Sequence, residues 1–324
     1  MPTPQLAKPR VVVSKCLEFA PCRYNGAMIS DELVRRLKEH VDFVPVCPEM
    51  EVGLGCPREP IRVVLVEKQP HLIQPATGKD FTQPMQQFAA SFLAGVGEVD
   101  GFLLKSRSPS CGIKDVKVFA GPEHKTPQKL GRGFFGGAAL DRFPDLPVED
   151  EGRLSNFSLR EHFLARLFTL TALRRVRAAG RMGGLVEFHA ANKWLLMACH
   201  QSELRIMGRI VANAADRPPA EVLAEYGPHL ARALARLPRA ASVVNVLMHA
   251  LGYVSDNLSA GEKAFFLDVL KKYRGGTAPL SAATTLLNAW GIRFHATYLL
   301  EQTFLEPYPE PLVSISDSGK GREG

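Results

Sequence analysis

The chain has 324 residues, of which 46% are hydrophobic and 23% are charged. This balance excludes a disordered or low-complexity protein, and the length suffices for two domains with buried cores. No apolar run approaches the roughly 20 residues that a membrane-spanning helix needs, and the first residues lack the apolar core of a secretory signal. We therefore expect a globular, cytoplasmic protein.

Positive charge is concentrated in the second half of the chain. Residues 1–150 hold 19 Lys and Arg against 18 Asp and Glu, whereas residues 151–324 hold 21 against 15. A basic surface suits an anionic partner, of which nucleic acid is the commonest. The alternative is a basic but otherwise ordinary soluble domain.

Strands and helices alternate in the first half, which predicts an α/β domain built on a doubly wound, Rossmann-like parallel sheet. The predicted strands cover residues 11–14, 42–46, 61–67 and 101–104, and the predicted helices open at Ser30 and span 81–93. Ligands of such sheets bind beyond the carboxyl ends of the strands, so we expect the functional site there.

The second half shows helical periodicity and almost no strand-like alternation, which predicts an all-helical domain. A stretch rich in Pro and acidic residues at 143–150 marks the connection, and Ser158 with Glu161 matches a capping box at the start of the first helix. The predicted parts are an α/β domain at 1–150, a helical domain at 151–312 and a disordered tail at 313–324.

Three cysteines, Cys16, Cys47 and Cys111, each follow a predicted strand, so their thiols could converge on one rim of the sheet. In a cytosolic chain of this length, clustered cysteines indicate metal binding or catalysis more often than disulfides. Zinc sites usually carry closely spaced pairs such as C-x2-C, which the chain lacks. Single cysteines at strand ends fit an iron–sulfur cluster with three protein ligands better, and ordinary buried cysteines are the alternative.

Three groups of motifs stand in a fixed order along residues 8–150. They are Ser14-Lys15-Cys16-Leu17 with Arg23-Tyr24-Asn25-Gly26, Val46-Cys47-Pro48-Glu49 with Gly53 and Pro57-Arg58, and Ser108-Pro109-Ser110-Cys111-Gly112. Together they resemble the thiouracil desulfidase (TudS) family. The resemblance implies a 4Fe-4S cluster and hydrolytic removal of sulfur from thiolated uracil compounds. Lys15, where a small residue is usual, and the extra thiol of Cys56 depart from the family pattern.

The same resemblance implies roles for individual residues. The cluster ligands would be Cys16, Cys47 and Cys111, the catalytic glutamate Glu49, and the catalytic serine either Ser108 or Ser110. A thiocarbonyl sulfur is a soft ligand that suits an open iron, and the iron would polarise the C=S bond while Glu49 activates water. Without Cys47 beside it, Glu49 would be an ordinary loop carboxylate, and the two serines would belong to a plain turn.

The helical half carries a second resemblance. Leu185–His189, Lys193 and Leu196–Ala198 are similar to a helical domain that follows the desulfidase domain in some bacterial proteins, which look like desulfidases acting on 4-thiouridine in tRNA. A basic end of the first helix in this half is formed by Arg174, Arg175, Arg177 and Arg181. Contact with RNA phosphates is one interpretation of these arginines, and favourable charge at a helix C-terminus is the other.

Three functions are therefore open. The first hypothesis is an iron–sulfur-dependent desulfidase that acts on 4-thiouridine in tRNA. The second is a desulfidase of free thiouracil or thiouridine monophosphate, in which the helical domain forms a homo-oligomer. The third is a cluster-bearing regulatory or RNA-binding protein without turnover, against which the presence of Glu49 argues.

Overall fold

The computed structural model describes residues 8–213 and 215–314, which form two compact units. Within these ranges, residues 8–167 and 311–314 make an α/β unit, and residues 168–310 make a helical unit. None of the described helices is both long and apolar enough to cross a membrane. The division at residue 150 stays a prediction, and the predicted tail lies outside the described residues from 315 onward.

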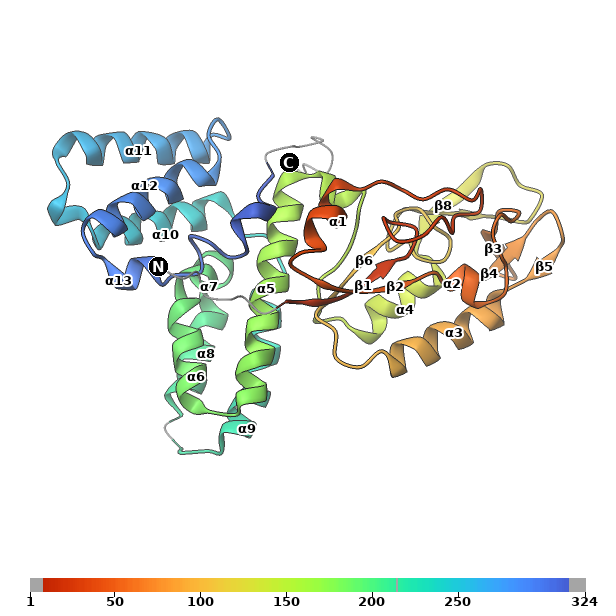
Figure 1. Ribbon diagram of the computed structural model, residues 1–324, viewed down its shortest axis with the longest axis horizontal. Helices are drawn as coiled ribbons and strands as arrows, with labels where there is room; N and C mark the ends of the chain where they lie inside the picture. The colour runs from red at the N-terminus through yellow and green to blue at the C-terminus, as the bar shows by residue number, and fades with distance from the viewer. Residues whose placement is uncertain (1–7, 214, 315–324) are drawn as a thin grey trace. The chain divides into compact units, whose positions relative to one another are not determined.

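A four-stranded parallel sheet forms the centre of the α/β unit, in the order β2-β1-β6-β9 (Figure 1). Its strands are β1 (Arg10–Ser14), β2 (Asp42–Val46), β6 (Gly101–Leu104) and β9 (Val148–Asp150). Val11 and Val13 point to the face opposite Val12, and all three are buried, so both faces of the sheet are covered. The predicted α/β fold on a parallel sheet is confirmed.

Four helices accompany this sheet. They are α1 (Glu32–Leu37), α2 (Pro48–Glu51), α3 (Thr82–Gly95) and α4 (Phe134–Arg142). Helices α3 and α4 lie side by side on one face of the sheet, where Leu93 and Phe135 pack in one cluster with Val12, Phe102 and Leu104 (Figure 1). Burying side chains of this size stabilises the fold by about 1.5–3 kcal/mol each, so this cluster fixes α4 against the strand ends.

A second sheet of five strands, in the order β5-β4-β3-β7-β8, corrects the assignment of residues 61–67. The strands are β3 (Arg62–Val66), β4 (Gln69–Gln74), β5 (Lys79–Asp80), β7 (Val116–Phe119) and β8 (Pro127–Gly131). Strand β3 pairs antiparallel with β4 and parallel with β7, so it does not join the main sheet. The prediction of one parallel sheet from all four apolar runs is therefore wrong for this run.

The long helix α5 (Phe157–Ala179) begins in the residues of the α/β unit, and its second half belongs to the helical unit. Asn156 caps it by accepting a hydrogen bond from the amide of Leu159, so the capping box predicted at Ser158 is wrong. The remaining helices are α6 (Met182–Ala191), α7 (Lys193–Cys199), α8 (Gln201–Ala212), α9 (Pro219–Ala233), α10 (Ala240–Gly252), α11 (Ala260–Arg274), α12 (Leu280–Arg293) and α13 (Thr297–Leu300). Short 3-10 turns cover Arg153–Ser155, Ser255–Asn257 and Glu310–Leu312.

Candidate active site

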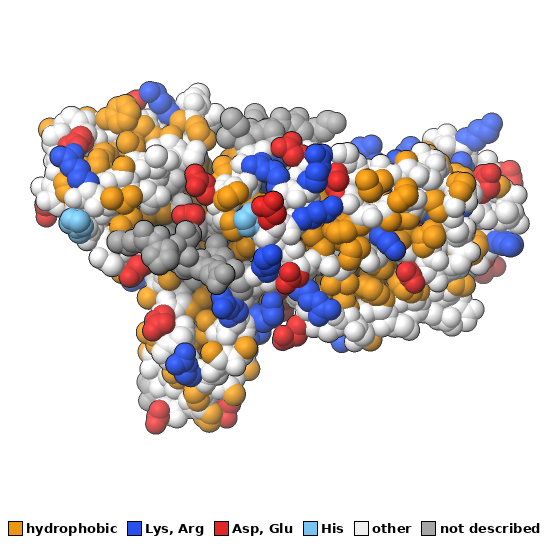
Figure 2. Space-filling model, viewed as in Figure 1, with side chains coloured by type: hydrophobic (Ala, Val, Ile, Leu, Met, Phe, Trp, Pro, Cys, Tyr) orange, Lys and Arg blue, Asp and Glu red, His pale blue; other side chains and the backbone are white. Residues whose placement is uncertain are grey.

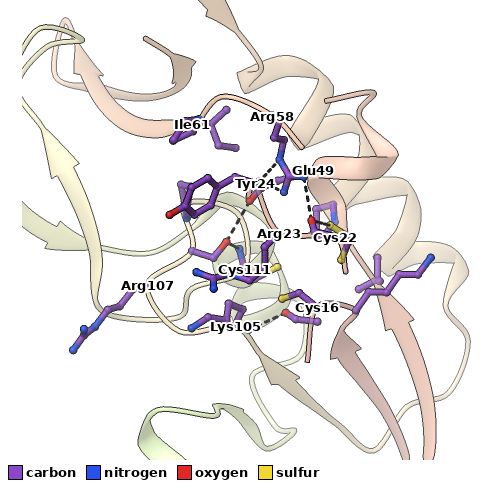
Figure 3. Close-up of a pocket in the computed structure, with 18 of the residues that line it drawn as sticks. Cys16, Cys22, Arg23, Tyr24, Glu49, Arg58, Ile61, Lys105, Arg107 and Cys111 are labelled. Carbon is purple, nitrogen blue, oxygen red and sulfur yellow. Dashed lines mark hydrogen bonds and ion pairs between the residues drawn. The ribbon is translucent and has the colours of Figure 1, made fainter. Parts of the chain in front are cut away.

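A cavity of about 340 Å³ opens beyond the carboxyl ends of β1, β2 and β6 (Figure 3). The segments that follow these three strands supply most of its lining, as expected for a parallel sheet. Its lining includes the residues Ser14, Lys15, Cys16, Cys22, Arg23, Tyr24, Cys47, Glu49, Arg58, Lys105, Ser106, Arg107, Ser108 and Cys111.

Four thiols face this cavity. Cys16 follows β1, Cys47 is the N-cap residue of α2, and Cys111 lies in the loop after β6. Cys22, for which no motif predicts a role, lines the same space, and in Figure 3 its sulfur atom faces those of Cys16 and Cys111. All six cysteines of the chain are free thiols. Within the ranges that the structure describes, no group of three His, Cys, Asp or Glu side chains is arranged to hold a single metal ion.

Burial raises the pKa of three of these thiols, those of Cys16, Cys22 and Cys111. It raises the pKa of Cys16 to about 12, and the neighbouring Cys47 adds to the shift. Burial also raises the pKa of Cys22 to about 12 and the pKa of Cys111 well above its ordinary value. Thiols of this kind are protonated near neutral pH, and a bound metal has to displace their protons.

Glu49 stands in the first turn of α2 and is the only carboxylate among the described residues that line the cavity. Its side chain is 13% exposed. The hydroxyl of Ser110 donates to Oε1 of Glu49 at 2.9 Å, and the hydroxyl of Ser108 lies 3.5 Å from the same oxygen. The structure therefore brings together all three residues that the motifs single out for chemistry.

The two serines differ in their surroundings. Ser108 lines the cavity, and its hydroxyl also accepts hydrogen bonds from the amides of Ser110 and Cys111. Ser110 is fully buried and does not belong to the cavity lining. A molecule bound in the cavity can thus reach Ser108, whereas Ser110 contacts the carboxylate of Glu49 from a position outside the cavity lining.

Arg58 binds the other oxygen of Glu49. Its Nε and Nη2 lie 2.9 and 2.5 Å from Oε2, and only 4% of the arginine side chain is exposed. Nη1 donates to the backbone carbonyls of Cys22 and Gly55 at 3.0 and 2.8 Å. Sequence reasoning included Arg58 in a motif but gave it no role, because nothing in the spacing shows that it pairs with Glu49.

The loop that carries Cys111 is fastened to the N-terminus of α4. The amides of Phe135 and Gly136 both donate to the carbonyl of Ser110, at 2.9 and 3.0 Å, and the amide of Gly133 donates to that of Gly112 at 2.7 Å. This approach requires glycine, since a Cβ on Gly136 would lie 2.3 Å from the carbonyl oxygen of Cys111. The thiol therefore keeps its place through the first turn of a helix that belongs to the core.

A second charged pair, Lys105 with Glu151, lies beside Cys16. Lys105 Nζ forms an ion pair with Glu151 Oε1, and the amide of Ser106 donates to Glu151 Oε2 at 2.7 Å. The pair arises from the sheet register, because Leu104 of β6 stands opposite Asp150 of β9 and each charged residue comes next. The sequence does not reveal this pair, because the Pro-rich, acidic residues 143–150 have the composition of a connection and not of a strand.

Further cations and an aromatic ring stand at the same cavity. Lys15, Arg23 and Arg107 line it, and Tyr24 is 44% exposed with the guanidinium of Arg23 over its ring at 5.7 Å. Arg107 has a φ of 58° and extends away from the cysteines in Figure 3. Among the described residues that line the cavity, basic side chains thus outnumber Glu49.

The arginines predicted to contact RNA belong to the helical unit. Arg174, Arg175 and Arg177 lie near the end of α5, and Arg181 is the N-cap residue of α6. The guanidinium of Arg177 packs against Gly227 of α9, where it occupies the space of a side chain. A Cβ on Gly227 would lie 1.5 Å from Nη2 of this arginine. On the face seen in Figure 2, Lys and Arg alternate with Asp and Glu over α1 and the first part of α5. This face of the α/β unit carries mixed charge rather than a single basic patch there.

Comparisons with known proteins divide the chain into two matching regions. The family described as 2-thiouracil desulfurase matches residues 11–151, and the family described as a protein of unknown function (DUF1722) matches residues 193–309. The uncharacterized protein YbbK of Bacillus subtilis (strain 168) is 36% identical over 109 residues, which cover 32% of this chain and 72% of that protein. The uncharacterized protein YbgA of Escherichia coli (strain K12) is 26% identical over 160 residues, 48% of this chain and 93% of that protein. A solved structure, the [4Fe-4S]-dependent thiouracil desulfidase TudS, is 28% identical with a TM-score of 0.36, and the match covers 45% of this chain and 93% of that one.

Proposed function

The chain belongs to the 2-thiouracil desulfurase family through residues 11–151, and we propose that it is an iron–sulfur-dependent desulfidase of 4-thiouridine in tRNA. Water would replace sulfur at the ring carbon, so that 4-thiouridine and water give uridine and hydrogen sulfide without net electron transfer. The observation that carries this proposal is the meeting of Glu49 and Ser108 with three thiols around one cavity.

The donor set fits a 4Fe-4S cluster better than a single metal ion. Cys16, Cys47 and Cys111 come from the ends of three parallel strands and face one cavity, yet no three side chains in the described ranges are arranged for one ion. Cluster ligands bind different irons and therefore stand around a larger centre. We propose these three cysteines as the ligands. When bound, such a cluster supplies a Lewis-acidic iron without a protein ligand, which suits the soft sulfur of a thiocarbonyl.

Glu49 is proposed as the general base. Its largely buried carboxylate would take a proton from water as the water oxygen forms its bond to the ring carbon. Ser110 donates to Oε1 and would orient the carboxylate, while Ser108 would donate a hydrogen bond to the substrate ring from the cavity wall. The C–S bond then breaks, and the sulfur leaves as sulfide.

The choice of tRNA as substrate is supported by the second half of the chain. Residues 151–324 carry 21 Lys and Arg against 15 Asp and Glu, and Arg175 and Arg181 are exposed at neighbouring helix ends. Neutralisation of phosphates by such side chains releases counterions and adds binding energy. A free thiolated base carries no phosphate and would gain nothing from this charge.

One comparison of substrates tests the proposal. Full-length protein, reconstituted without oxygen, is incubated with tRNA containing 4-thiouridine, with 4-thiouridine monophosphate and with free thiouracil, and sulfide and uridine are measured. We expect the highest kcat/KM on tRNA. For Glu49→Gln we expect unchanged iron content and turnover lower by roughly 100-fold or more. No sulfide release from any substrate would refute the enzyme, and equal kcat/KM on all three would refute tRNA as the preferred substrate.

A further inference from the structure

Arg58 is a buried cation that lines the cavity and binds Glu49, another residue of its lining. Its Nε and Nη2 donate to the carboxylate of Glu49, and its Nη1 donates to the backbone carbonyls of Cys22 and Gly55. Its side chain is 4% exposed, compared with 56% for Arg35 in the surface pair with Glu18. A charge taken so far out of water needs full pairing, and Glu49 with the two carbonyls provides it.

These contacts determine which oxygen of Glu49 is available for chemistry. Oε2 receives both Nε and Nη2 of Arg58, whereas Oε1 faces the hydroxyls of Ser110 and Ser108. Because the guanidinium is planar and is itself fixed by two carbonyls, it restrains rotation of the carboxylate about its last side-chain bond. One oxygen is thereby held, and the other is directed toward the serine that lines the cavity.

We propose that Arg58 is the positioning residue of the reaction, which holds the Glu49 carboxylate so that Oε1 meets the attacking water. The inference rests on the proposed desulfidase activity and adds a residue to which neither the motifs nor the family assignment gives a role. Arg58 acts through Glu49 and not on the substrate. Its removal therefore lowers kcat, leaves KM nearly unchanged, and has no further effect once Glu49 is no longer a base.

Five variants test this statement against the parent: Arg58→Met, Arg58→Lys, Glu49→Gln, the double variant Arg58→Met/Glu49→Gln, and Arg35→Met. Methionine keeps the apolar stem and removes the charge. Lysine keeps the charge but has no planar fork, so it restores only part of the pairing. Arg35→Met is the matched control, because it removes an exposed arginine from an arginine–glutamate pair outside the cavity.

Each protein is measured for iron and sulfide per chain, for the urea midpoint of unfolding, and for kcat and KM per cluster in single-turnover and steady-state assays. For Arg58→Met we expect kcat to fall on the order of 100-fold, the effect of a displaced catalytic group, with KM within about threefold of the parent. The kcat of Arg58→Lys should lie between those of the parent and Arg58→Met, and the kcat of Arg35→Met should equal that of the parent. In the Glu49→Gln background, Arg58→Met should change kcat by less than about twofold.

Several outcomes overturn the proposal. A raised KM with unchanged kcat would mean that Arg58 binds substrate, and an additive loss in the double variant would mean that it does not act through Glu49. If Arg58→Met fails to fold, Arg58→Lys alone is decisive, since kcat equal to the parent refutes positioning by the fork. A parent without turnover refutes the proposed function instead. In that case the urea midpoints of the parent, Arg58→Met, Glu49→Gln and the double variant still test the contact between the two residues. If the two single changes in midpoint add up to that of the double variant, Arg58 does not hold Glu49.

Discussion

Gly136 offers a quantitative test of how the Cys111 loop is held. A Cβ at this position would lie 2.3 Å from the carbonyl oxygen of Cys111 and 2.6 Å from that of Gly112, well inside van der Waals contact. Because both are backbone atoms, Gly136→Ala must displace the loop or the start of α4. At Gly137, the next residue of the same helix, a Cβ would lie 3.5 Å from the Cβ of Arg132, which is an ordinary contact.

The two substitutions should therefore change stability in opposite directions. In a helix, Ala in place of Gly stabilises by up to about 1 kcal/mol, which we expect for Gly137→Ala. Overpacking costs about 1–3 kcal/mol, so Gly136→Ala should be destabilised by that amount, about 2–12 °C in the unfolding temperature of a unit of this size. Displacement of the Cys111 loop should also lower the iron and sulfide content after anaerobic reconstitution.

The assay compares the parent with both variants by thermal unfolding and by iron and sulfide analysis. Gly137→Ala controls for helix propensity, because it makes the same chemical change one residue later. If Gly136→Ala were as stable as Gly137→Ala and took up as much iron, the close approach of α4 to the Cys111 loop would not hold that loop, and the reasoning would be refuted.

Three further predictions concern other parts of the chain. Cys47→Ala should lose the iron and sulfide that Cys199→Ala retains, as measured after anaerobic reconstitution. Charge reversal of Arg175 and Arg181 together should weaken the binding of tRNA regardless of its sequence. The slope of log K against log salt concentration should become shallower by about 2, one for each lost phosphate contact. Burial, together with a neighbouring positive charge, holds the pKa of His189 below its ordinary value of 6.5. The unfolded chain therefore binds a proton first, so this contribution to stability is present above about pH 6.5 and is lost as the pH falls, and urea midpoints for His189→Gln should depend less on pH in this range.

The parallel sheet could be predicted because its strands carry their own signal. Val11–Ser14 and Gly101–Leu104 are short apolar runs that become fully buried, and the residues after them lie at the same edge of the sheet for a topological reason. The meeting of Cys16 with Cys111 therefore follows from strand direction, before any side-chain detail is known.

In the second sheet the run at 61–67 is predicted as a strand, but nothing in the sequence indicates its partners. The central hairpin of this sheet joins β3 to β4 through Glu67 and Lys68, both with positive φ, where Asn and Gly are the residues that usually indicate a two-residue turn. The edge strand β9 has only three residues, which is too short for an alternating pattern to distinguish it from a connection. The ion pair of Arg58 with Glu49 could not be predicted from the sequence either. It depends on the path of the loop between the two residues, and no periodic pattern indicates that path.

The register of β9 has a consequence for the order of folding. Strand β1 is central in the sheet, β6 pairs beside it, and β9 joins last in sequence at the edge. At about 5–20 residues per second of synthesis, several seconds pass between the emergence of Cys16 and that of Cys111 from the ribosome. Until β6 has paired with β1, the early thiols have no enclosed partner site and are exposed to oxidants in solution. The wall of the cavity is thus completed late, and a chain interrupted before residue 151 would leave Lys105, which lines the cavity, without its ion-pair partner Glu151.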